Sequence, residues 1–184
     1  WARSRGLGDV YKRQHLDKRS LLHLESKPNL FDETPYALNE FTIHKHATSA
    51  LITVHIYVDG VFLNSYWADG IIVATPTGST AYSLSCNGPI IHPSSKTFVI
   101  TPVAPHNLNV RPIVIPDSCK ITFKIEGRSN DFLCTLDSRY ETVTDNHTLS
   151  LKKEKFKLHL VRTANQNFFS TIRNKLMWGV DSRN

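Results

Sequence analysis

Residues 49–74, SALITVHIYVDGVFLNSYWADGIIVA, decide the fold. From Ile52 to Val58 every second residue is apolar, and this period of two is typical of a half-buried strand. Asp59-Gly60 then supplies two residues that tolerate a positive φ, so it predicts a tight hairpin turn. Residues 61–67 form the expected partner strand. The stretch therefore predicts a β-hairpin followed by more β structure.

The next residues continue this pattern. Asp69-Gly70 predicts a second turn, and Ile71 to Ala74 is a short apolar run of the kind that forms a buried strand. Further strands are predicted at residues 98–100, 113–115, 121–126, 132–136, 149–151 and 156–160. So many short strands predict a mostly β protein, built as a multi-stranded β-sandwich.

Two segments have helical patterns instead. Thr80 to Cys86 follows a Pro-Thr-Gly-Ser turn and is a candidate helix. Residues 167–178 are a stronger candidate, because Phe169, Ile172 and Leu176 fall on one helical stripe. Gly179 is suited to end that helix. We therefore expect the sandwich to carry a C-terminal helix at about 167–178.

Composition excludes several classes of protein. The chain has 184 residues and a net charge of +6, which suits a polyanionic ligand. It has no run of about 18 apolar residues for a membrane span. Its nine histidines form no metal motif, and no basic–aromatic interleaving predicts a nucleic-acid groove. Three scattered cysteines fit a reducing, cytoplasmic location. We expect no metal-binding motif within the chain, and neither a nucleic acid nor a membrane as a partner.

The first 14 residues, WARSRGLGDVYKRQ, differ in composition from the rest of the chain. We expect them to be a non-native tail, and we leave them out of the fold prediction. Residues 15–184 are then expected to form one all-β domain that includes the C-terminal helix.

Residues 69–85, DGIIVATPTGSTAYSLS, carry the chemistry. They predict a buried strand, a sharp turn and a helix start, with the hydroxyls of Thr75, Thr77, Ser79 and Thr80 close together. Gly78 permits a ligand to approach the backbone. Such a turn suits ribose hydroxyls, phosphates or carboxamides. The alternative is that these Ser and Thr residues are ordinary helix caps.

This string, followed by Gly88-Pro89-Ile90, resembles the signature of the NAD kinase family. Other ordered blocks resemble the same family: Ala37-Leu38-Asn39-Glu40, Thr101 to His106, Arg111-Pro112-Ile113-Val114, Asp137-Ser138-Arg139 and Phe168 to Gly179. The matches run from about Arg19 to the end of the chain. The resemblance implies the all-β C-terminal domain of such a kinase, whose full-length members add an N-terminal α/β lobe.

The resemblance also implies a set of residues that bind NAD. Asn39 and Glu40 match the family's pair for the adenosine part, and Asp69 matches its aspartate at the nicotinamide end. The binding loop would consist of Thr80, Ala81, Tyr82, Ser83, Leu84 and Ser85, with Arg139 as a further polar contact. Ala50, Trp67 and Ala104 are weaker expectations, and other members often carry a basic residue at the place of Trp67.

In the family, the reaction transfers the terminal phosphoryl group of ATP to the 2′-hydroxyl of the NAD adenosine ribose, with magnesium, and makes NADP. The catalytic base is the aspartate of a Gly-Gly-Asp-Gly motif, which this sequence does not contain. We therefore expect no catalytic residue in this chain and no kinase activity from it alone. The resemblance further implies a homodimer or homotetramer.

Two alternatives stay open. One is a lipid or diacylglycerol kinase relative, which shares the two-lobed plan but not the long Thr-Pro-Thr-Gly-Ser-Thr-Ala-Tyr string. The other is a non-catalytic dinucleotide-binding module.

Overall fold

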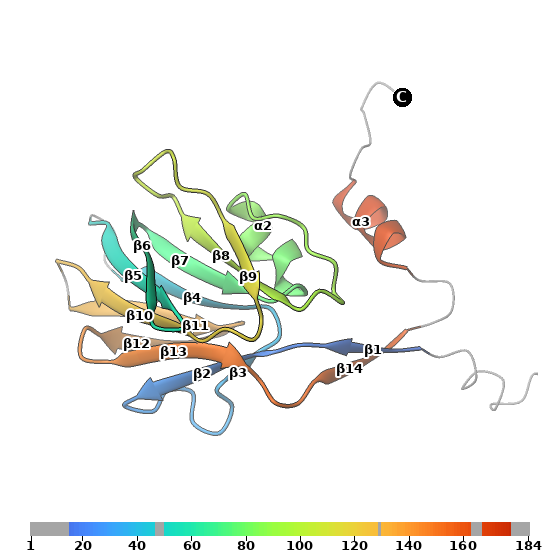
Figure 1. Ribbon diagram of the computed structural model, residues 1–184, viewed down its shortest axis with the longest axis horizontal. Coiled ribbons are helices and arrows are strands. Elements are labelled where there is room, and N and C mark those ends of the chain that lie inside the picture. The colour runs from blue at the N-terminus through green and yellow to red at the C-terminus, as the bar shows by residue number, and fades with distance from the viewer. Residues whose placement is uncertain (1–14, 47–49, 129, 163–166, 178–184) are drawn as a thin grey trace, which may run out of the picture. The chain divides into compact units, whose positions relative to one another are not determined.

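The described residues of 20–157 fold mainly into two stacked antiparallel sheets (Figure 1). The computed structural model describes residues 15–46, 50–128, 130–162 and 167–177. The first sheet has the order β3 (Tyr36–Ala37), β2 (Leu22–Lys27), β13 (Thr148–Lys153), β10 (Ile121–Glu126), β5 (Ile52–Val58) and β6 (Val61–Ala68). The second has the order β12 (Arg139–Thr144), β11 (Asp131–Leu136), β4 (Glu40–Lys45), β7 (Gly70–Ala74), β8 (Thr97–Val103) and β9 (Ile113–Pro116). The predicted mostly β sandwich is confirmed.

The core lies between the two sheets. Phe41 of β4 packs against Phe123 of β10, with ring centroids 5.3 Å apart. Both rings are buried, as are the alternating Ile52, Val54 and Ile56 of β5. Burial of each such side chain contributes about 1.5–3 kcal/mol to folding. This packing fixes the strands of the two sheets relative to one another, and with them the ends of the loops that connect the strands.

The predicted hairpin is confirmed. β5 and β6 pair in an antiparallel register, with Val58 opposite Val61. Asp59 and Gly60 make the turn with φ angles of 51° and 80°. The register shifts between Ile56 and Tyr57, which is a β-bulge in the hairpin.

The predicted second turn at Asp69-Gly70 is a bend between two sheets and not part of a hairpin. Here the chain crosses from β6 in the first sheet to β7 in the second. Gly70 is the first residue of β7, and a Cβ on it would lie 2.4 Å from the carbonyl oxygen of Ile43. The glycine is therefore required by the close approach of β4 rather than by a positive φ.

A second compact unit contains the described residues of 1–19 and 159–184. It includes β1 (His15–Arg19), which pairs with β14 (Leu158–Arg162), and helix α3 (Phe168–Leu176). The side-chain oxygen of Asn167 accepts a hydrogen bond of 2.8 Å from Ser170 N, so Asn167 caps the helix. Met177 ends it with a φ of 50°. The predicted tail 1–14, Trp178 and Gly179 lie outside the described residues.

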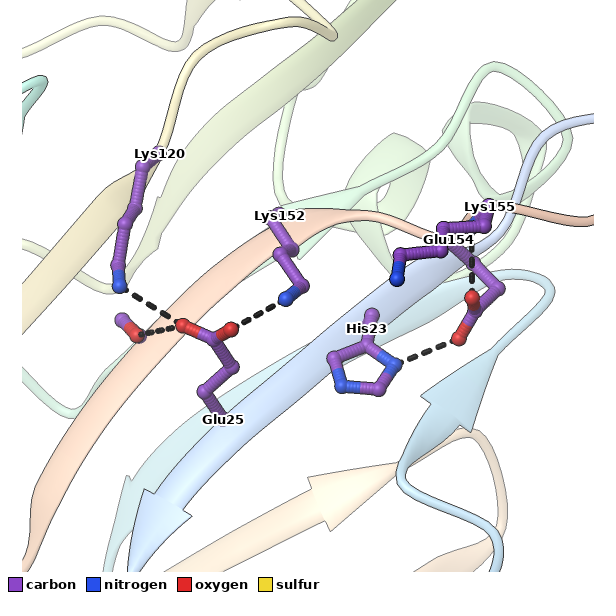
Figure 2. A network of polar contacts seen from close by, with 7 residues as sticks. His23, Glu25, Lys120, Lys152, Glu154 and Lys155 are labelled. Atoms are coloured by element: carbon purple, nitrogen blue, oxygen red, sulfur yellow. Dashed lines mark hydrogen bonds and ion pairs between the residues drawn. The ribbon is translucent and has the colours of Figure 1, made fainter.

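The outer face of the first sheet carries an ionic network (Figure 2). The Glu25 carboxylate accepts hydrogen bonds from Lys120, at 2.7 Å, and from Lys152. Beside it, His23 lies 2.5 Å from a Glu154 oxygen. The hydrogen bond from Lys120, followed by that from Lys152, lowers the pKa of Glu25 to about 2. Glu25 therefore stays ionised and links β2 to β13 and to the start of β10.

Among the described residues, no helix has the length and apolar character needed to cross a membrane.

Candidate functional site

The loop that follows β7 packs on Leu38 and Asn39, the two residues just before β4. Thr75 N donates to the Asn39 carbonyl at 2.9 Å, and Thr75 Oγ1 donates to the Leu38 carbonyl at 2.6 Å. A Cβ on Gly78 would lie 2.1 Å from the Asn39 carbonyl oxygen. The predicted Asn39-Glu40 pair and the predicted ligand loop are therefore brought together, because β4 and β7 are neighbouring strands with Glu40 opposite Ala74.

A single carboxylate holds residues 38–40 from the other side. Asp137, in the turn between β11 and β12, accepts hydrogen bonds from Leu38 N at 2.9 Å, Asn39 N at 2.8 Å and Glu40 N at 3.2 Å. Its own backbone N donates to the Glu40 carbonyl at 2.9 Å. Asp137 lies in the Asp137-Ser138-Arg139 block that resembles the family, but no role was predicted for it. An aspartate in a turn before a strand is the signal that was available.

Glu40 has an unusual carboxyl group. Its Oε2 is buried and has no hydrogen-bonding partner among the described residues. Burial, and secondarily the nearby charge of Asp137, raises the pKa of Glu40 to about 7. A buried polar atom without a partner requires an explanation, and a bound hydroxyl group is a suitable one.

The expected row of hydroxyls divides into buried and accessible groups. Ser79 is buried, and its Oγ donates to the Pro76 carbonyl at 2.7 Å and accepts from Ile91 N at 3.0 Å. Ser83 is buried too, with its Oγ 2.9 Å from Thr101 Oγ1. Thr80 is half-buried, whereas Ala81, Tyr82 and Ser85 are exposed and Leu84 is half-buried. Only part of the predicted contact stretch thus faces outward.

The predicted helix at 80–86 is shorter than expected. The structure has a single 3-10 turn, η1 (Gly78–Thr80), and a single α-helical turn, α2 (Tyr82–Ser85). Because Gly78 rests on Asn39 and the Tyr82 ring lies over His44, the segment runs along β4. β4 therefore positions both ends of the loop.

Tyr82, His44 and Asp69 form an aromatic and charged group next to this segment. The Tyr82 and His44 rings stack with centroids 5.6 Å apart and planes at 24°. Lys45 Nζ lies 2.5 Å from Asp69 Oδ1. Burial lowers the pKa of His44, which favours the neutral ring. His44 was not among the predicted site residues, because a single histidine between Ile43 and Lys45 matches no motif.

Trp67 and Ala104 lie at the ends of β6 and β8. Trp67 is 52% exposed, and its ring lies 4.3 Å from the ring of His106. Both rings line a pocket of about 590 Å³ together with residues 105–110. Ala104 is exposed with a φ of 44°, and Ala50 is half-buried. Their role in ligand binding stays a prediction.

Arg139 is tied to the loop before β4. Its guanidinium donates to the Thr34 carbonyl at 2.5 Å, to Thr34 Oγ1 at 2.6 Å and to the Tyr36 carbonyl at 2.5 Å. It also lies 5.7 Å from the centre of the Phe31 ring. In this geometry Arg139 organises residues 31–36, and its predicted contact with a ligand stays a prediction.

Among the described residues, no group of three or more His, Cys, Asp or Glu side chains gathers as a metal site. The magnesium that the resemblance implies stays a prediction, because this cation is commonly held by one or two carboxylates together with the phosphates of the substrate.

The family model for the ATP-NAD kinase C-terminal domain matches residues 38–163, which include the Asn39-Glu40 pair, the loop after β7 and Asp137. The chain belongs to this family. As an ATP-NAD kinase C-terminal domain, it has close relatives. It is 57% identical to the NAD kinase of Cytophaga hutchinsonii over 92% of this chain and 58% of that protein. It is 47% identical to the NAD kinase of Flavobacterium psychrophilum over 94% of this chain and 60% of that protein.

Solved structures agree with the fold of this ATP-NAD kinase C-terminal domain. A yeast NADH kinase complexed with NADH superposes with a TM-score of 0.82 at 28% identity, over 94% of this chain and 52% of that one. An NAD kinase from Archaeoglobus fulgidus in complex with ATP superposes with a TM-score of 0.70 at 24% identity, over 86% of this chain and 61% of that one. The chain spans only about three fifths of the length of the relatives that it matches.

Proposed function

We propose that this chain provides the dinucleotide-binding part of an NAD kinase. One observation carries the proposal: the buried Glu40 Oε2 lacks a partner among the described residues, at the place where the loop of Gly78 meets Asn39. A carboxylate there can accept hydrogen bonds from the two vicinal hydroxyls of a ribose. The relatives named NAD kinase support the same ligand.

In this proposal each residue has a physical role. The Asn39 amide offers both a donor and an acceptor to the adenosine part, and Glu40 accepts from its ribose. The exposed ring of Tyr82, supported by His44, packs against the base or the sugar. Asp69 is proposed to contact the nicotinamide end of the dinucleotide. The remaining contacts are proposed for Thr80, Ala81, Ser83, Leu84, Ser85 and Arg139, with weaker ones for Ala50, Trp67 and Ala104.

In the full-length protein, these proposed contacts would orient NAD so that the 2′-hydroxyl of its adenosine ribose faces the terminal phosphoryl group of ATP. Such transfers depend mainly on positioning and on neutralising charge. The proposed base is the aspartate of the family's Gly-Gly-Asp-Gly motif, which this sequence does not contain. The residues of this chain thus bind and orient NAD without removing the proton.

Titration calorimetry with NAD tests the binding proposal. We expect saturable binding by the chain, a loss of at least tenfold in affinity for Glu40→Ala, and no change for Glu141→Ala, a substitution of an exposed glutamate on β12. Equal affinities for all three proteins, or no binding by any, would refute it.

A coupled assay of NADP formation tests whether this chain binds NAD without catalysing the phosphoryl transfer. We expect no turnover by the 184-residue chain with NAD, ATP and magnesium. Clear turnover would show that the chain carries its own base. Magnesium as the metal, a cytoplasmic location and assembly as a homodimer or homotetramer stay predictions.

A further inference from the structure

We propose that Asp137 is a positioning residue, which holds residues 38–40 in the conformation that binds NAD. The inference rests on the proposed function for its ligand, and it adds a residue that lies outside the expected set of NAD contacts. Its basis is the set of hydrogen bonds by which the Asp137 carboxylate accepts from three successive backbone N–H groups.

Three backbone N–H groups point at the side chain of Asp137, and only a carboxylate can accept from all of them. Oδ1 accepts from Asn39 N and Glu40 N, and Oδ2 accepts from Leu38 N. An asparagine keeps one acceptor oxygen but turns an NH₂ group toward the third donor, so it cannot satisfy the set. Hydrogen bonds to an ionised group are also stronger than neutral ones. The backbone of the Asn39-Glu40 pair is thus fixed by charge as well as by geometry.

The carboxylate itself is held in place. Asp137 has a φ of 51°, and its backbone N donates to the Glu40 carbonyl at 2.9 Å. Its turn joins β11 to β12, and β11 pairs with β4 with Leu136 opposite Phe41. The same strand pair therefore aligns Asp137 with the residues that it holds.

Asp137 also acts on the charge of Glu40. Burial is the main reason that the pKa of Glu40 is high, and the negative charge of Asp137 is the second. From the other side, residues 38–40 face Ala74, Thr75 and Gly78, which carry no charge. Removal of the Asp137 charge should therefore let Glu40 ionise at a lower pH.

The experiment compares the wild-type chain with Asp137→Asn, Asp137→Ala and the control Asp145→Asn. Asparagine tolerates a positive φ, so the first variant keeps the turn. Asp145 is exposed in the turn between β12 and β13. NAD affinity is measured by calorimetry across pH values around 7, and the ionisation of Glu40 by carboxyl NMR in the ligand-free chain.

We expect Asp137→Asn to bind NAD roughly tenfold more weakly, Asp137→Ala to bind more weakly still, and Asp145→Asn to match wild type. The Glu40 titration midpoint should move down in both Asp137 variants and stay in place in the control. Unchanged affinity, or weaker binding with an unshifted Glu40 midpoint, would overturn the inference.

The two proposals fail in different ways. Absence of NAD binding by the wild-type chain would end the proposed function, while the Glu40 midpoint in the ligand-free variants would still decide the effect of Asp137. Normal NAD binding by wild type and by Asp137→Asn alike would end only the role of Asp137.

Discussion

Gly78 rests directly on the backbone of Asn39: a Cβ at position 78 would lie 2.1 Å from the Asn39 carbonyl oxygen and 2.7 Å from its Cα. Such contacts are far inside van der Waals distance, and both partners are main-chain atoms that cannot swing away. The absence of a side chain at position 78 is therefore what permits the loop after β7 to meet the start of β4.

Gly78→Ala should push this loop away from Asn39. We expect a loss of about 1–3 kcal/mol in the free energy of unfolding and at least a tenfold loss in NAD affinity. The measurements are urea denaturation and calorimetry. Gly60→Ala is the matched control, because Gly60 has open space around it but a φ of 80°. It should cost about 1 kcal/mol of stability and leave NAD affinity intact. Equal NAD affinity of Gly78→Ala and wild type would contradict this role of the glycine.

Glu40→Gln should stabilise the ligand-free chain at alkaline pH. The pKa of Glu40 is raised in the folded chain from 4.5 to about 7. The protonated Glu40 therefore contributes its full stability to the folded chain below pH 4.5, and this contribution is lost as the pH rises through about 7. Glutamine stays neutral, and we expect a gain of about 1–3 kcal/mol at about pH 8 and none at about pH 4. Urea denaturation at both values checks this. NAD affinity at about pH 8 should fall, since the anionic acceptor is gone.

The NAD affinity of wild type should rise with pH, because the ionised form of Glu40 is the stronger acceptor. The increase is expected across the range centred on about 7. Calorimetric titrations at several pH values measure it, and Glu40→Gln provides the flat reference. A wild-type profile as flat as that of the variant would count against Glu40 as the ribose acceptor.

Tyr82 and His44 should act as a pair. Tyr82→Ala removes the exposed ring, and we expect NAD affinity to fall by about five- to tenfold. His44→Ala leaves Tyr82 without its stacking partner and should reduce affinity by a smaller factor. His44→Phe keeps a flat ring under Tyr82 and should restore most of the loss. If the phenylalanine variant binds NAD no better than the alanine variant, the stacking contact does not support the site.

Glu25→Gln should weaken the first sheet at neutral pH only. Because the pKa of Glu25 is lowered, its ionised carboxylate stabilises the folded chain above pH 4.5, and this stabilisation is lost as the pH falls toward about 2. The carboxylate is 36% exposed, so solvent screening limits the effect to about 0.5–1 kcal/mol at neutral pH. Denaturation curves of both proteins should converge in strong acid. A constant difference at all pH values would mean that packing rather than charge is responsible.

The fold was largely predictable where the pattern of residues was local. The alternation from Ile52 to Val58 and the turn at Asp59-Gly60 predicted the β5–β6 hairpin, and the apolar run after Gly70 predicted β7. The residue pattern did not predict the strands β1, β2, β3, β4 and β12. β4 buries three successive residues from Phe41 to Ile43, so it shows no alternation, and the edge strand β12 buries only Val143.

The site was predictable in outline only. The resemblance pointed to Asn39, Glu40 and the loop of Thr80, and the structure brings the start of β4 and that loop into contact. Which hydroxyls are already used inside the protein depended on long-range packing, as for Ser83 with Thr101. The clamp of Asp137 on residues 38–40 joins positions far apart in the sequence, and no local pattern predicts such a contact.

The order of the strands also bears on how the sandwich assembles. Leu24 pairs with Leu151 and Ile43 pairs with Cys134, so both sheets join segments that are far apart along the chain. Proteins dominated by such distant pairings have a high contact order and fold slowly, on a scale of about milliseconds to seconds. Because β11 must dock on β4 before Asp137 can reach residues 38–40, the proposed dinucleotide site cannot form before this distant strand pair does.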